Sequence, residues 1–325
     1  MAPPRAKRYP MIAAIAATFA LIAIGYAIAA ARVLKEGTGE GLADFVFTIA
    51  IPVLLFRTLS TADFSGAAPL PLWGAYFGGV AVTWVAATLA LRRGFGRDAR
   101  SGVVAGLAGT FSNLVLIGIP LTLAVFGQRG FEVLSLILAI HLPVMMAATV
   151  ILMDRAAVAD GTAAAASSPR EVASRFLHGM MLNPIVIGIL GGVAWRLLGL
   201  PTPAFFADLI DRVAGVAGTL ALIALGMSLR KFGIARNAAQ GAAVTVVKLA
   251  VLPATVTLLA LLFQPPPLAA HVAIVGAAMP TGANPYLIAS RFGTGEALAS
   301  NAALIGTMLS PLTILFWLFV ARALF

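Results

Sequence analysis

The sequence contains no cysteine and few charged residues. Of its 325 residues, 10% are charged, and only 12 are Asp or Glu. The absence of cysteine excludes disulfides and thiolate metal sites, and a soluble domain would carry about 25% charged residues. Hydrophobic residues make up 61% of the chain, and the mean hydropathy is +1.00. The sequence therefore predicts an all-α polytopic membrane protein.

The distribution of basic residues indicates which partners the chain is expected to have. The net charge is +10, but Lys and Arg are scattered among short connections between apolar segments, as in membrane proteins. We therefore expect the lipid bilayer and no nucleic acid as a partner. The charged start resembles a signal peptide, yet the apolar run 11–30 is long enough to span a bilayer, so we interpret it as the first helix.

Ten apolar segments of roughly 20 residues are each long enough to cross a membrane. The second contains Pro52, which predicts a distorted helix. The longest connection, 154–182, is a linker loop between a first five-helix repeat, 1–153, and a second, 183–325. The predicted spans are 10–30, 42–59, 71–91, 101–126, 131–153, 183–200, 206–229, 239–263, 268–290 and 298–322.

Spans four and nine carry residues that interrupt a helix at bilayer depth. Proline removes a backbone donor, and Asn and Ser are costly in hydrocarbon. A span that breaks there must line a cavity or lie inside protein, and paired breaks in two halves point to a transporter's binding site. We predict a substrate site formed by Ser112, Asn113, Gly118, Pro120, Pro280, Thr281, Asn284 and Pro285.

The two halves are expected to form an inverted repeat. With five spans in each half, the second half enters the membrane from the opposite face, and segment 119–130 resembles segment 284–295. Asn113 and Asn284 should then face each other near the bilayer midplane, where their amides could hold an anion. The alternative is that these residues only hydrogen-bond between helices.

Two further polar side chains lie within predicted spans. Lys248 is about ten residues into span 239–263, where a lysine costs about 2.5–3.5 kcal/mol on insertion scales. It would either supply positive charge for an anion or cap the carbonyl ends of a broken helix. His141, in span 131–153, would be either a proton relay or a packed, hydrogen-bonded residue.

The numbers of basic and acidic residues predict the orientation of the chain in the membrane and whether transport is coupled to Na⁺. One side of the ten-span arrangement collects 13 basic residues and the other 8, which places the linker in the cytoplasm and both termini outside. Neither broken span contains Asp or Glu between 102 and 126 or between 268 and 292. We therefore expect no metal or other cofactor, and transport that does not strictly require Na⁺.

Four stretches, taken in order, carry a resemblance to a known family. They are FSNLVLIGIPL (111–121), NPIVIGILGG (183–192), ALIALGMSL (221–229) and AAMPTGANPYLIASRFG (277–293). The chain resembles the auxin efflux carrier family, including its bacterial malonate-type permeases in the inner membrane. The resemblance implies the fold of bile acid–sodium symporters, with crossed, broken helices four and nine. It also implies elevator-like alternating access and a homodimer.

These observations favour a secondary transporter for a small organic anion, such as a carboxylate. The alternatives are a passive anion channel or facilitator and a sodium-coupled organic-acid symporter. An enzyme is not expected, because the chain has no H-E-x-x-H motif, no paired intramembrane carboxylates and no usefully spaced Ser/His pair. A receptor is not expected either, because the spans occupy most of the chain.

Overall fold

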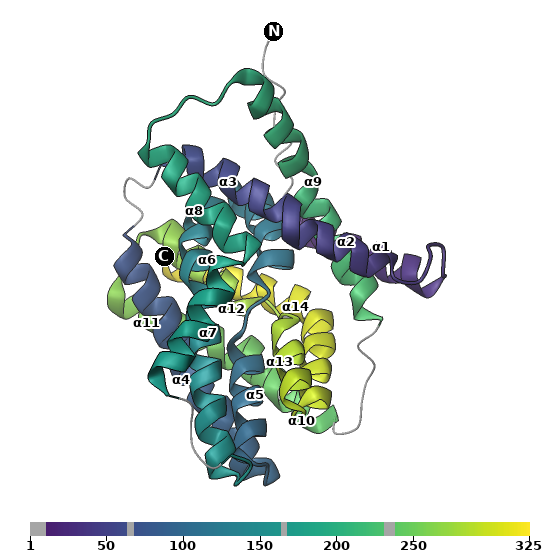
Figure 1. Ribbon diagram of the computed structural model, residues 1–325, viewed down its shortest axis with the longest axis vertical. Helices are drawn as coiled ribbons and strands as arrows, with labels where there is room; N and C mark the ends of the chain where they lie inside the picture. Colours follow the sequence, from purple (N-terminus) through teal and green to yellow (C-terminus); the bar gives the residue numbers. More distant parts are fainter. Residues whose placement is uncertain (1–10, 64–67, 164–167, 231–237) are drawn as a thin grey trace.

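A computed structural model describes residues 11–63, 68–163, 168–230 and 238–325, and all its named elements in these ranges are helices (Figure 1). Three short π-helical segments, η1 to η3, adjoin α-helices. The elements are α1 Met11–Ala30, α2 Thr38–Phe45, η1 Val46–Ala50, α3 Ile51–Thr61, α4 Pro69–Phe95, α5 Ala99–Thr110, η2 Leu114–Gly118, α6 Ile119–Ala159, α7 Pro169–Met181, α8 Pro184–Leu197, α9 Ala204–Leu229, α10 Ala238–Val246, η3 Val247–Val251, α11 Leu252–Phe263, α12 Pro267–Ala278, α13 Asn284–Phe292 and α14 Glu296–Leu324.

Among the described residues, seven helical runs are long and apolar enough to cross a membrane, and α8 and α12 are shorter apolar helices. The predicted class, a multi-pass helical membrane protein, is confirmed. Within the helical run Leu114–Ala159, two helices meet at Gly127, where the boundary between spans four and five is expected. There Gly127 bends α6 with a φ of 67°, a conformation that glycine adopts without steric cost.

Each π-helical segment precedes a helix that carries proline in its first turn. Pro52, Pro120 and Pro253 are the second residues of α3, α6 and α11. Proline has no N–H, so the carbonyl four residues earlier loses its helical partner and the turn widens. Beside Pro253 this carbonyl belongs to Leu249, and the indole N–H of Trp317 donates to it at 2.8 Å. The distortion expected at Pro52 is therefore present as a widened turn.

Glycines bring two pairs of helices into backbone contact. A Cβ atom on Gly226 of α9 would overlap the carbonyl oxygen of Ile22 in α1. Gly188 of α8 faces the backbone of Pro52 in α3 in the same way. Small residues at such crossings let membrane helices approach closely. Together, α1, α3, α8 and α9 form one packed group beside the interrupted spans.

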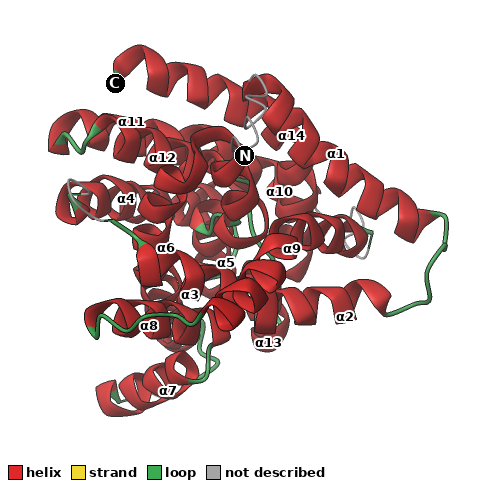
Figure 2. Cartoon of the chain, turned by 90° about the horizontal axis from the view of Figure 1, so that it is seen from above, coloured by secondary structure: helices red, strands yellow, loops and turns green. Residues whose placement is uncertain are grey.

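The connection 154–182, expected as a loop, contains regular structure at both ends. Helix α6 continues to Ala159, and α7 begins with a capping box. In it, Ser168 Oγ accepts from the N–H of Glu171, whose carboxylate accepts from the N–H of Ser168. Such reciprocal bonds stabilise a helix start. Figure 2 shows α7 at the edge of the bundle, near α8.

Candidate functional site

The breaks in the two interrupted spans meet each other. Residues 111–113 separate α5 from η2, and residues 279–283 separate α12 from α13. Ser112 and Thr281 form an isolated antiparallel bridge. The N–H of Asn113 donates to the carbonyl of Pro280 at 2.9 Å, and the N–H of Gly282 donates to the carbonyl of Phe111 at 3.1 Å. Each break thus satisfies backbone groups that the other leaves free, as burial in a membrane requires.

Side chains also form hydrogen bonds where the two breaks, residues 111–113 and 279–283, lie against each other, a region that we call the crossing. The hydroxyl of Thr281 donates to the carbonyl of Ala108, near the end of α5, at 2.7 Å. Lys248 is fully buried, and its Nζ donates to the carbonyl of Ala277 at 2.6 Å and to Ser112 Oγ at 3.0 Å. The ammonium therefore caps the carbonyl end of α12, one of the two roles considered from the sequence.

A cavity of about 150 Å³ lies against this crossing. Its apolar wall includes Phe47, Phe111 and Leu138. Among the described residues that line it there is no Asp, Glu, Lys or Arg. Its polar side chains come from Ser112, Asn113, His141, Asn183 and Asn284.

Three of these residues mark helix starts. Asn113 is the N-cap of η2, and its Oδ1 accepts from the N–H of Leu116 at 3.2 Å. Asn183 is the N-cap of α8, and its Oδ1 accepts from the N–H of Ile185 at 2.9 Å. Asn284 is the first residue of α13. Helix N-termini carry partial positive charge and favour anions, so three helix starts bring partial positive charge to a cavity whose described lining residues include no charged side chain.

The predicted site residues separate into two groups. Ser112, Asn113, His141 and Asn284 line the cavity. The other predicted residues belong to the breaks but do not line the cavity. Gly118 ends η2, and Pro120 and Pro285 lie in the first turns of α6 and α13. Pro280 and Thr281 form hydrogen bonds across the crossing, and Lys248 donates to Ser112 from behind it.

Asn183 was not predicted as a site residue. The sequence offers a signal, because Asn183–Pro184 repeats the Asn–Pro pair of residues 284 and 285. Asn is a preferred N-cap and Pro a preferred first helical residue, so each pair predicts a helix start. That two of these helix starts open onto one cavity depends on packing between distant segments.

His141 differs from the other polar residues of the cavity wall. It is 3% exposed, and neither ring nitrogen has a hydrogen-bond partner among the described protein groups. Its ring packs edge-on against Phe111 and Tyr76, with centroid distances of 4.9 and 5.8 Å. Of the two expected roles, the packing is present, but the expected hydrogen bonds to protein groups are not.

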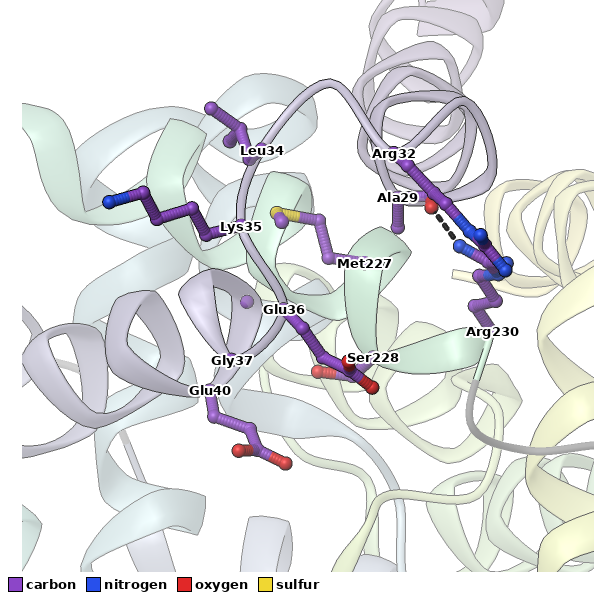
Figure 3. Close-up of a pocket in the computed structure, with 11 residues that line it drawn as sticks. Ala29, Arg32, Leu34, Lys35, Glu36, Gly37, Glu40, Met227, Ser228 and Arg230 are labelled. Atoms are coloured by element: carbon purple, nitrogen blue, oxygen red, sulfur yellow. Dashed lines mark hydrogen bonds between the residues drawn. The ribbon is translucent and has the colours of Figure 1, made fainter.

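A larger cavity of about 500 Å³ lies elsewhere, between the α1–α2 connection and the end of α9 (Figure 3). Arg32, Lys35 and Arg230 share it with Glu36 and Glu40, and the Arg230 guanidinium donates to the carbonyl of Ala29. Charges of both signs line this exposed cavity, and none of the predicted site residues reaches it. The crossing cavity is therefore the candidate site.

The described residues contain no group of three or more His, Asp or Glu side chains that could hold a metal ion. The cavity instead offers amide groups, one hydroxyl and one imidazole. This donor set suits a small polar molecule. Together with the membrane-spanning helices and the paired breaks, it is typical of a membrane transporter.

Comparisons with known proteins give the family. Residues 10–318 match the family model described as "Membrane transport protein", so the chain belongs to this auxin-efflux-like family and the predicted resemblance is confirmed. The chain is 28% identical over 319 residues to a "Putative malonate transporter" of Rhizobium meliloti, covering 94% of each chain. It is 25% identical over 304 residues to an "Uncharacterized transporter" of Methanothermobacter thermautotrophicus, covering 91% of this chain and 94% of that one.

Proposed function

We propose that this transporter carries a small organic anion, specifically a carboxylate, and that the crossing cavity is its binding site. The observation that carries the proposal is the convergence of three helix starts on a cavity whose described lining residues include no Asp or Glu. Because Oδ1 of Asn113 and of Asn183 already accepts backbone bonds, their NH₂ groups are left to donate to a ligand. A carboxylate, which only accepts hydrogen bonds, matches these donors.

The size of the cavity supports a small substrate. Its volume of about 150 Å³ compares with roughly 30 Å³ for each molecule of liquid water, which leaves room for a short acid. The name of the Rhizobium meliloti relative agrees with a carboxylate of this size. Neutral donors would hold the anion without burying an Arg charge, which favours release as well as binding.

We further propose that the chain forms two inverted five-span repeats, 1–153 and 183–325, that operate as an elevator-type carrier in a homodimer. The reciprocal bonds between the two breaks support the inverted repeat. The cavity also receives Phe47 from η1, which packs against α3 and α9, and Asn183 from the start of α8, which packs against α3. A site between two packed groups can open to either side when one moves against the other.

The direct test is binding to the purified protein. Carboxylates of increasing length should raise the melting temperature in a concentration-dependent way, because a ligand that binds only the folded state stabilises it. Short acids should act at lower concentration than long ones. A screen in which no carboxylate changes the melting temperature, or a ligand-bound structure with density away from the crossing, would contradict the proposal.

Transport assays distinguish a carrier from a channel or facilitator. A carrier must return its binding site, so unlabelled substrate on the opposite side should accelerate uptake of labelled substrate into proteoliposomes. Uptake should also persist when Na⁺ is replaced by K⁺ at fixed pH, because the residues that the structure describes around the cavity include no acidic side chain. Loss of uptake in K⁺ would establish the sodium-coupled symporter instead, and uptake without trans-acceleration would favour a channel.

We propose the orientation that the basic residues predict, with the linker 154–182 in the cytoplasm and both termini outside. The chain has no cysteine, so single introduced cysteines can be labelled in intact cells. Ser174→Cys, on exposed α7, should be protected from an impermeant reagent, and Leu324→Cys should be labelled. The opposite pattern would reverse the orientation.

A further inference from the structure

His141 is a buried polar side chain whose hydrogen-bonding capacity the protein leaves unused. Both ring nitrogens are buried and lack a partner among the described protein groups, and His141 is one of the residues that line the crossing cavity. An unsatisfied buried polar group costs about 1–3 kcal/mol, so its presence in a folded protein needs an explanation. A ligand in the cavity would supply the missing partner.

Aromatic packing fixes the position of this imidazole. Phe111 and Tyr76 contact the ring edge-on, and Phe77 lies 6.3 Å away between centroids. A ring clamped by three neighbours cannot swing away to find a partner elsewhere. The side chain is therefore preorganised, and preorganised groups bind with a smaller loss of conformational entropy.

The imidazole adds a chemical property that the amides of Asn113 and Asn183 lack. Because Oδ1 of each already accepts a backbone bond, these two amides are left with donors, which suit an ionised carboxylate. A neutral imidazole has one donor and one acceptor nitrogen, so it can also receive a hydrogen bond from a protonated group. His141 belongs to α6, whereas Asn183 and Asn284 belong to the starts of α8 and α13. The cavity thus combines two kinds of polar group from different elements.

We propose that His141 forms a second subsite, which holds the distal carboxyl group of a short dicarboxylic acid. This inference rests on the proposed function: the first carboxylate binds at the helix N-termini, and His141 selects acids that carry a second one. The volume of about 150 Å³ suits two carboxyl groups that are joined by a short chain. An acid of equal length with a methyl group at its far end would leave His141 unpaired.

Malonate and propionate test this selection, because they differ by one carboxyl group in place of a methyl group. The wild-type protein should bind malonate at least about tenfold more tightly than propionate, the ratio expected from one additional hydrogen-bonded group of about 1.4 kcal/mol. His141→Phe keeps an aromatic ring against Phe111 and removes both nitrogens. Its malonate-to-propionate ratio should fall toward one, with propionate affinity within about twofold of the wild-type value.

Two further variants separate selection from general damage. His141→Gln keeps one donor and one acceptor and should recover part of the preference for malonate. Asn113→Ala should weaken both acids by similar factors and leave their ratio unchanged. If His141→Phe does not fold, His141→Leu replaces it and is compared with His141→Gln.

The outcomes distinguish this inference from the proposed function. An unchanged ratio in His141→Phe, while both acids still bind, would overturn the second subsite and leave the carboxylate carrier intact. Absence of binding of either acid to the wild-type protein would contradict the carboxylate site itself. A parallel loss of both acids in His141→Phe and His141→Gln, at unchanged melting temperature, would assign His141 to general binding rather than to selection.

Discussion

The two breaks at the crossing are closed by different chemistry. At the first break, the side chain of Asn113 caps the helix that follows, and Thr281 satisfies the carbonyl of Ala108 with a neutral hydroxyl. At the second break, the ammonium of Lys248 satisfies the carbonyl of Ala277. A hydroxyl and an amide therefore close the first break, whereas Nζ of Lys248 closes the second and also donates to Ser112 of the first.

The helix starts after the two breaks also differ. No side chain in the described part of the chain caps α13, which Ala283 precedes. Asn284 is half-buried, whereas Asn113 is only 6% exposed. An uncapped helix start retains backbone donors for a ligand. The comparison indicates that the contacts of the first break mainly stabilise the fold, whereas the second break leaves the N-terminus of α13 available for binding a ligand.

The sharpest test of this difference substitutes the two asparagines. Asn284→Ala should weaken carboxylate binding roughly ten- to a hundredfold, because one hydrogen bond to a bound anion contributes on the order of 1.5–3 kcal/mol. Its melting temperature should not change. Asn113→Ala should weaken binding and also lower the free energy of unfolding by about 0.5–2 kcal/mol, because it removes an N-cap.

Titration calorimetry and thermal unfolding of the purified proteins measure both quantities. Asn301→Ala is the matched control, because Asn301 is fully buried in α14 and does not line the cavity. It should leave carboxylate affinity within about twofold of wild type. Equal loss of stability in Asn113→Ala and Asn284→Ala would abolish the proposed difference between the breaks.

Lys248→Met tests how the lysine side chain closes the second break. Methionine keeps the approximate length of the side chain but leaves the carbonyl of Ala277 without its donor. The free energy of unfolding should fall by about 1–3 kcal/mol, with a smaller effect on affinity than that of Asn284→Ala. Chemical unfolding in detergent measures the change, with Val246→Met, on the exposed side of α10, as control. Unchanged stability together with a loss of carboxylate affinity would show that Lys248 acts in substrate binding rather than in capping.

Thr281→Val should have the smallest effect. The substitution keeps the branched shape and removes the hydroxyl that donates to the carbonyl of Ala108. We expect a loss of about 0.5–1.5 kcal/mol in unfolding free energy. Thr257→Val is the control, because that hydroxyl donates within its own helix, to the carbonyl of Pro253. A melting temperature lowered equally by both variants would show that the hydrogen bond across the crossing stabilises the fold no more than a hydrogen bond within one helix.

Local properties of the sequence determined the class of the protein and the location of both breaks. Hydropathy identifies membrane segments because the bilayer demands apolar surface along about 20 residues. Prolines and asparagines at bilayer depth identify the breaks because each disturbs its own helix. The same signals led to Ser112, Asn113 and Asn284, which line the cavity. The capping box of α7 was also present in the sequence, within an Ala/Ser-rich stretch that reads as a loop.

Only the tertiary structure decided which groups satisfy one another. Lys248 reaches Ser112 across 136 residues of sequence, and nothing near either residue specifies that contact. Asn183 joins the cavity because α8 packs beside the crossing. The ring nitrogens of His141 lack hydrogen-bond partners among the described protein groups, because aromatic neighbours surround the ring. A sequence shows which groups need partners, since that need is a property of the residue. The partner itself is chosen by the packing of distant segments.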